Sequence, residues 1–346
     1  MRVAWGVVTG LTSLIRGPAS FYLSRFCLGA AEAGFFPGVL LYLTFWFPSG
    51  RRTRLIAFFL LALPVSGFVG SASAGWIMHA LGGVSGLRSW QWLFLLQGVP
   101  AVLLGVFCYF YLDDGPGTAR WLTDAERAVI KDDLAADQAA KTHVKRHSFT
   151  AALCSPRVYV IGFVGAGTYV LAISQQYWLP LIINASGVRN ILSVGLLSSI
   201  PPVFGLFVMI LVGRSSDRWL ERRWHFAIPE LAGAAAMLFL SVLYDNPYVV
   251  VGLLALMTAG HFAGVTVYWS LPSIYLSEQA AAGGIAVVSA IAAVGGALTP
   301  LMLGWIRTRT GDLSLGLQIS AGLVTLGSVI LLIGLPARVL QEPHSG

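Results

Sequence analysis

Long apolar runs recur along this chain of 346 residues, and short polar segments separate them. A run of about 20 apolar residues can cross the ~30 Å hydrocarbon core of a bilayer as a helix. The pattern therefore predicts an all-α polytopic membrane protein with about ten spans. Their approximate ranges are 3–16, 20–48, 54–80, 90–112, 157–183, 190–212, 225–244, 247–276, 283–305 and 313–335.

The segment 113–156 breaks this pattern, because it holds seven of the fifteen acidic residues. Within it, the sequence TDAE at Thr123–Glu126 has the spacing of a capping box and predicts the start of a short surface helix. We therefore expect a water-exposed connector at 113–156. It would join an N-terminal bundle of residues 1–112 to a C-terminal bundle of residues 157–346.

Composition and charge support a membrane protein. Hydrophobic residues make up 56% of the chain and charged residues 11%, against about 25% charged in a typical soluble domain. Mean hydropathy is +0.76. The net charge of +7 lies in short basic clusters between apolar runs, a membrane-topology pattern rather than a nucleic-acid-binding one. With the connector in the cytoplasm, Lys and Arg divide 16 inside to 5 outside, which predicts two cytoplasmic termini.

The second apolar run contains two charged residues, Arg25 and Glu32. Seven residues are two helical turns, so both side chains lie on one face about 10 Å apart and cannot pair with each other. A carboxylate near the bilayer midplane is costly unless it is protonated or faces a wet cavity. Two structural alternatives stay open: Arg25 could snorkel to the outer headgroups, and Glu32 could pair with a helix that this chain lacks.

Further candidates lie in later runs. His261 could titrate near neutral pH, or it could be a hydrogen-bonded core histidine. Polar and aromatic residues that could line a cavity, or else pack and form interfacial belts, are Tyr169, Gln175, Gln176, Tyr177, Trp178, Trp269 and Ser270. The three cysteines have no metal-ligand spacing, and no HExxH, GxSxG or P-loop motif is present. We expect no metal site and no enzyme.

Several motifs together resemble one family. They are RFCLGAAEAGFFPGVLLYLTFWFPSGRRTR (25–54), WQWLFLLQGVPAVLLG (90–105), FYLDDGPGTARWLT (110–123), GRSSDRWLERRWHFAIP (213–229) and GGIAVVSAIAAVGGALTPLMLGWI (283–306). The chain resembles the anion:cation symporter family of the major facilitator superfamily, in particular bacterial permeases for organic carboxylates such as tartrate, phthalate or galactonate. The resemblance implies a two-bundle fold of twelve helices, of which this chain would lack the first two.

The resemblance also implies roles for single residues. Arg25 matches the family's anion-binding arginine, and Glu32 matches its proton-coupling glutamate. GRSSDR matches the superfamily loop motif, in which Gly213, Asp217 and Arg218 would latch one conformation; a plain basic inner loop is the alternative. The motif's first-half copy and the first helix's Asp-Arg pair are absent. In the ninth run the family often has asparagines, whereas here Ser289 can still hydrogen-bond and Ala293 cannot.

The function expected from these observations is proton-coupled symport of a small organic anion by alternating access. The protein would be a monomer in the inner membrane, driven by the proton gradient without a cofactor, with the lipid bilayer and the anion as partners and no nucleic acid. The alternative is a truncated, transport-inactive membrane fragment or a binding partner.

Overall fold

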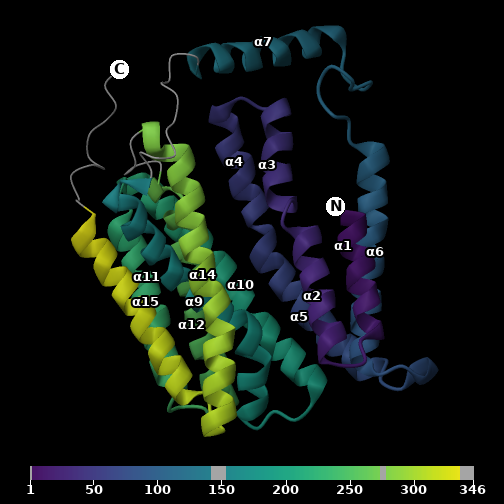
Figure 1. Cartoon of the computed structure of the whole chain (residues 1–346), viewed down its shortest axis with the longest axis vertical. Coiled ribbons are helices and arrows are strands. Elements are labelled where there is room, and N and C mark those ends of the chain that lie inside the picture. The colour runs from purple at the N-terminus through teal and green to yellow at the C-terminus, as the bar shows by residue number, and fades with distance from the viewer. Residues whose placement is uncertain (1, 142–152, 273–277, 336–346) are drawn as a thin grey trace. The chain divides into compact units, whose positions relative to one another are not determined.

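Every regular element is a helix in the part of the chain that the computed structural model describes, residues 2–141, 153–272 and 278–335 (Figure 1). The chain divides into two compact units. The first comprises Met1–Ala62 and Ser73–Val144, and the second comprises Leu63–Ala72 and Lys145–Gly346. The all-α fold class predicted from hydropathy is confirmed. The predicted domain limits at 112/113 and 156/157 stay predictions.

The helices of the amino-terminal part of the chain are α1 (Arg2–Leu11), α2 (Pro18–Glu32), α3 (Phe35–Trp46), α4 (Ser49–Leu60), α5 (Ala62–Ala80), α6 (Ser89–Tyr111) and α7 (Asp124–Lys141), with short 3-10 turns at Thr12–Leu14 and Val84–Gly86. Helix α1 packs closely along α6. A Cβ atom on Gly98 would come within 2.8 Å of the Gly10 nitrogen, so the two backbones touch. Small residues permit this close approach in lipid, where packing rather than the hydrophobic effect holds helices together.

Seven of the described helices are long and apolar enough to cross a bilayer. Three predicted runs do not meet that criterion. The run 3–16 forms the short α1 and a 3-10 turn, and the run 20–48 is divided between α2 and α3. The run 225–244 corresponds to α11 (Arg223–Leu240), whose apolar character is lowered by two charged residues, Arg223 and Glu230. The end of the predicted span 247–276 lies outside the described residues.

The break between α2 and α3 falls directly after Glu32. Ala33 and Gly34 form a turn, and α3 begins at Phe35. Pro37 has no backbone N–H, so the carbonyl of Ala33 would lack its donor in a continuous helix, whereas in the first turn of a new helix no donor is needed. The predicted single span therefore becomes two helices, and Glu32 lies at the junction.

The predicted surface helix of the connector is α7, and its capping box is confirmed. The Thr123 N–H donates to Glu126 Oε2 at 3.0 Å, and the Glu126 N–H donates to Thr123 Oγ1 at 3.3 Å. Arg127 fixes the preceding loop, because its guanidinium donates to the carbonyls of Pro116 and Ala119. Helix α7 runs across the ends of α3 and α4 (Figure 1). Residues 142–152 of the predicted connector lie outside the described part.

The second unit contains α9 (Pro156–Ala185), α10 (Ile191–Trp219), α11 (Arg223–Leu240), α12 (Pro247–Tyr268), α14 (Glu278–Thr310) and α15 (Ser314–Gly334). Glycines let these helices touch at the backbone. A Cβ on Gly260 of α12 would lie 2.5 Å from the Pro229 carbonyl oxygen of α11, and one on Gly295 of α14 would lie 2.9 Å from Cα of Ala166 in α9. We call the α11–α12 contact at Gly233, Gly260 and Gly264 the glycine seam.

Candidate functional site

A cavity of about 420 Å³ lies within the second unit among α9, α10 and α12, and residues 63–72 of α5, which belong to that unit, complete its wall. Its polar lining residues are Ser66, Ser71, Gln175, Gln176, Ser198, Thr258 and His261. None of the lining residues is Asp, Glu, Lys or Arg. The cavity is therefore polar but carries no fixed charge, and its volume suits a small organic molecule.

Three side-chain atoms at this cavity lack a hydrogen-bond partner in the described structure. They are Gln175 Oε1, Ser198 Oγ and His261 Nδ1, and all three are buried. In contrast, the Thr258 hydroxyl donates to the Leu254 carbonyl of its own helix at 2.7 Å. A buried polar group without a partner costs about 1–3 kcal/mol. A polar ligand in the cavity would remove that cost, so the three atoms mark the wall that a ligand would contact.

Prolines add backbone acceptors at the same place. Pro180 lies inside α9 and Pro202 lies inside α10, and both line the cavity. Because proline has no N–H, the carbonyls four residues earlier, those of Gln176 and Ser198, have no intrahelical donor. In a membrane such freed carbonyls are tolerated where they face a cavity. The wall can therefore accept hydrogen bonds from ligand hydroxyls as well as donate them.

Two predicted site residues, Gln175 and His261, are thus brought together, and two aromatic ones lie elsewhere. The ring of Tyr169 packs over Gly296 of α14, where a Cβ would come within 3.1 Å of Tyr169 Cδ1. The ring of Trp269 contacts that of Tyr268 edge-on, with centroids 5.2 Å apart. Neither Tyr169 nor Trp269 lines the cavity. Their places fit the packing alternative.

The two predicted serines bond within their own helices. Ser270 Oγ donates to the Val267 carbonyl at 2.6 Å, and Ser289 Oγ donates to the Ile285 carbonyl at 2.7 Å. Neither serine lines the cavity. Because the hydroxyl proton is used within the helix, each has less to offer a ligand than Ser198 has.

Arg25 and Glu32 belong to the first unit. Both lie on α2, and both side chains are exposed. The Arg25 guanidinium lies over the ring of Phe21, 5.1 Å from its centroid. Glu32 is the last residue of α2, at the break before α3. Broken helices are where transporters place substrate and ion sites, so this position agrees with the role that the resemblance implies for Glu32.

The predicted latch GRSSDR lies entirely in the last turns of α10 rather than in a loop, because α10 continues to Trp219. Leu220 then adopts a left-handed conformation with φ of 50°, and the chain turns back into α11. This turn brings Arg222 to Asp217, and the Arg222 guanidinium pairs with Asp217 Oδ1 at 2.6 Å. Arg218, the predicted latch arginine, is exposed on the surface.

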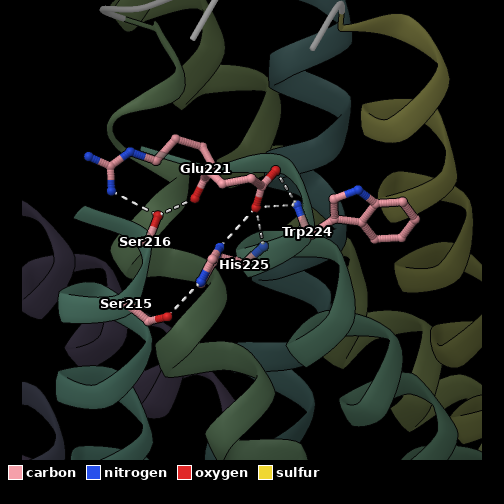
Figure 2. A network of polar contacts seen from close by, with 6 residues as sticks. Ser215, Ser216, Glu221, Trp224 and His225 are labelled. Atoms are coloured by element: carbon pink, nitrogen blue, oxygen red, sulfur yellow. Dashed lines mark hydrogen bonds and ion pairs between the residues drawn. The ribbon is translucent and has the colours of Figure 1, made fainter. Parts of the chain in front are cut away.

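A second set of contacts holds the same turn, as Figure 2 shows. His225 Nδ1 lies 2.8 Å from Glu221 Oε2, and His225 Nε2 lies 2.9 Å from Ser215 Oγ. Glu221 also accepts from the Trp224 N–H at 2.9 Å, which caps the start of α11. The Ser216 hydroxyl donates to the Glu221 carbonyl at 2.6 Å. The end of α10 and the start of α11 are therefore joined by side chains on both sides of the turn.

The Glu221 carboxyl gives this turn a pH dependence. Burial raises the pKa of Glu221, but the hydrogen bonds from Trp224 and His225 outweigh it, and the pKa lies below that of a free glutamate. A group whose pKa is lower in the folded state than in the unfolded state stabilises the fold at pH values above its unfolded pKa, which is about 4.3 for glutamate. This stabilisation is lost as the pH falls through the pKa of the folded state. At neutral pH the ionised Glu221 carboxylate therefore contributes its full stabilisation to the turn.

We expect Asp217→Asn to slow transport while leaving membrane insertion intact, because it removes the ion pair to Arg222 at the turn. Arg222→Ala should have the same effect, since it removes the other partner. Arg218→Ala is the matched control and should transport as the unsubstituted protein does. Initial uptake rates and expression levels of the three variants in membranes provide the measurement. Equal uptake rates in all three variants would show that the motif has no latch function and serves only as a basic inner loop.

Sequence reasoning missed three residues at these sites. Ser198 lines the cavity, Arg222 is the partner of Asp217, and Glu230 is buried in α11 at 1% exposure. For Glu230 a signal existed, a carboxyl inside an apolar run, which is the same signal that singles out Glu32. For Ser198 no local signal exists, because the cavity is formed by helices that are distant in sequence. For Arg222 the pairing depends on the left-handed turn at Leu220, which the sequence does not reveal.

Comparisons with known proteins agree with this picture. A sequence profile described as Major Facilitator Superfamily matches residues 2–300. A putative metabolite transport protein NicT of Pseudomonas putida is 38% identical over 342 residues, covering 99% of this chain and 78% of that protein. A putative tartrate transporter of Agrobacterium vitis is 40% identical over 333 residues, covering 96% of this chain and 76% of that protein.

Solved structures share the fold. The xylose transporter XylE from E. coli, in a partially occluded inward-open conformation, matches with a TM-score of 0.75 at 13% identity, covering 97% of this chain and 80% of that chain. The relatives named above are transporters and not enzymes, as expected for this chain. The chain spans a membrane with several helices and belongs to the Major Facilitator Superfamily.

Proposed function

We propose that the protein is a proton-coupled symporter of a small organic anion, of the hydroxycarboxylate type. One observation carries this proposal: the cavity in the second unit presents Gln175, Ser198 and His261 with buried atoms that lack partners. Together with the freed carbonyls, these groups match the donors and acceptors of a hydroxy acid. The relatives named as putative tartrate transporters support the same substrate class.

Arg25 and Glu32 complete the proposed mechanism. Arg25, which is exposed on α2, would supply a positive charge that binds the carboxylate of the anion, as the resemblance implies. Glu32 would take up the proton, because a carboxylate that enters a dry environment costs free energy that protonation removes. His261 would be the second proton-coupling group. Tyr169, Trp269, Ser270 and Ser289 stay secondary candidates for substrate contact.

Transport would proceed by rocking of two helical bundles around a site near the bilayer midplane. The protein would act as a monomer in the inner membrane, without a cofactor. We propose that the connector and both termini face the cytoplasm, on the 16-to-5 division of Lys and Arg. A reporter fused after Asp133 that signals from the periplasm would overturn this orientation.

The transport test uses the purified protein in proteoliposomes with radiolabelled tartrate as the probe. An inward proton gradient should drive accumulation of tartrate, and an uncoupler should abolish it. Glu32→Gln, which mimics the protonated state, should lose accumulation yet retain exchange of internal for external tartrate. Arg25→Ala should weaken binding in both assays. If Glu32→Gln still concentrates tartrate against its gradient, the coupling residue lies elsewhere.

The alternative is a membrane fragment that inserts without transporting, or a binding partner. It predicts neither accumulation nor exchange for any of the carboxylates tested, despite correct insertion. Exchange of tartrate without a response to the proton gradient would instead support transport by this protein and argue against proton coupling. Accumulation and exchange together therefore distinguish a proton-coupled symporter, an uncoupled transporter and a protein that does not transport.

A further inference from the structure

Glu230 is the one acidic residue that is fully buried in the described part of the chain. It lies on α11 with 1% of its surface exposed. Its carboxyl lies directly over Gly264 of α12, since a Cβ atom there would come within 2.1 Å of Glu230 Oε1. The glycine seam thus leaves room for this carboxyl where any larger residue would displace it.

Among the described residues, the Glu230 carboxyl makes no ion pair that could stabilise a negative charge. Glu230 Oε1 is buried and makes no hydrogen bond within the described structure. The hydroxyl of Thr168 on α9 lies beside the carboxyl, and its Oγ1 is also buried without a hydrogen bond. An ionised carboxyl in such surroundings is strongly disfavoured. This conformation therefore holds Glu230 as the neutral acid.

Helices α12 and α15 pack most extensively against α11 and contain no Lys or Arg. Helices α9 and α10 also contact α11, and their arginines, Arg157, Arg214 and Arg218, lie in the terminal turns of those helices. The titratable side chains of α12 are Tyr248, His261 and Tyr268, those of α9 include Tyr169, and α15 carries none between Ser314 and Gly334. On α11 itself Arg223 lies seven residues, about 10 Å, before Glu230. Its guanidinium donates instead to the Leu332 carbonyl.

His261 links this buried carboxyl to the cavity. It lines the cavity, and its Nδ1 is buried without a hydrogen bond. It precedes Gly264 by three residues on α12, so both lie on the same face of that helix. The ring also approaches the backbone of Thr168, whose side chain lies beside Glu230. The polar groups therefore follow one another from the cavity through His261 and Thr168 to Glu230.

We propose that Glu230 is a proton-binding residue of the carrier, loaded and unloaded from the cavity through His261 and the Thr168 hydroxyl. A proton from cavity water is taken up by the His261 imidazole. The imidazolium then donates a proton to the oxygen of the Thr168 hydroxyl. The hydroxyl releases its original proton, which binds to Glu230 Oε1. Glu230 thereby changes from a carboxylate to a carboxylic acid, and the His261 imidazole becomes neutral again. When the cavity opens to the other side of the membrane, the same steps in reverse release the proton from Glu230. This inference rests on the proposed proton-coupled transport.

Infrared spectroscopy of the protein in lipid nanodiscs tests the protonation directly, without transport. At neutral pH the unsubstituted protein should absorb as a protonated carboxyl group, and Glu230→Gln should lose that band. Asp245→Asn removes an exposed acid after α11 and should leave the band unchanged. Identical spectra for the unsubstituted protein and Glu230→Gln would overturn the proposal.

Transport provides the second test. Glu230→Gln should lose proton-driven accumulation of tartrate in proteoliposomes and retain exchange. Thr168→Val keeps the shape but removes the hydroxyl, so it should slow proton-driven uptake while the carboxyl band remains, and Thr168→Ser should restore the rate. Unchanged uptake in Thr168→Val and Glu230→Gln would overturn the proposal. If the unsubstituted protein ignores the proton gradient, the proposed function fails instead, and the infrared band still decides the state of Glu230.

Discussion

Gln175→Leu should abolish or strongly weaken uptake of the anion, because it replaces the polar wall of the cavity by an apolar side chain. The Gln175 carbonyl oxygen is buried without a partner, and its amide can donate to a carboxylate. A hydrogen bond to a charged group is worth about 1.5–3 kcal/mol, which corresponds to roughly a 10- to 150-fold loss of affinity. The apparent KM for tartrate in proteoliposomes measures the effect.

Two neighbouring serines supply a matched control for this experiment. Ser198→Ala removes a hydroxyl that lines the cavity without a partner, and it should raise the KM. Ser199→Ala removes a hydroxyl that donates to the Leu196 carbonyl of its own helix, and it should leave the KM unchanged. If Gln175→Leu and Ser198→Ala both transport with the KM of Ser199→Ala, the cavity is not the substrate site.

Gly260→Ala should greatly reduce the stability of the second unit. The new Cβ would lie 2.5 Å from the Pro229 carbonyl oxygen and 3.1 Å from Cα of Gly233. Both are backbone atoms, so only a separation of α11 from α12 relieves the clash. Overpacking of this kind costs about 1–3 kcal/mol and occasionally more. We expect a lower melting temperature in detergent and less monodisperse protein after solubilisation.

The matched control lies on the same helix. A Cβ on Gly252 of α12 would meet no atom within 4 Å. Gly252→Ala should therefore melt at or above the temperature of the unsubstituted protein, since alanine also has the higher helix propensity. Equal melting of Gly260→Ala and Gly252→Ala would contradict the close packing of the glycine seam.

Local sequence signals predicted the local structure well. The TDAE spacing identified the start of α7 because a capping box involves residues only three apart, and all of its contacts lie within one turn. Hydropathy identified the long spans for a similar reason, since the bilayer imposes length and polarity on each helix separately. Hydropathy did not show that one turn at Ala33–Gly34 divides the second apolar run into two helices.

The cavity could be predicted only in part. Gln175 and His261 stood out as polar residues in apolar runs, and the structure places both at the cavity. The same property did not distinguish them from Ser270 and Ser289, which bond to their own helices. Which face of a helix meets a neighbour depends on packing between distant segments, and one sequence does not show it.

The latch shows the same limit. The resemblance implied that Asp217 and Arg218 latch one conformation, and it named no partner for Asp217. In the structure the left-handed residue Leu220 reverses the chain, so Arg222, the residue before α11, reaches Asp217. A single backbone conformation therefore decides which arginine pairs, and leucine is not a residue whose preference for that conformation could be read from sequence.

The glycine seam has a mechanical consequence. Helices whose backbones touch cannot slide or tilt against each other without opening a void that nothing else fills. Helices α11 and α12 must then move together as one rigid body, so the distance between Glu230 and His261 stays fixed. Any change in the size of the cavity must then come from its other walls. Among these, α9 and α10 can bend at the prolines where the helical hydrogen bonds are already missing.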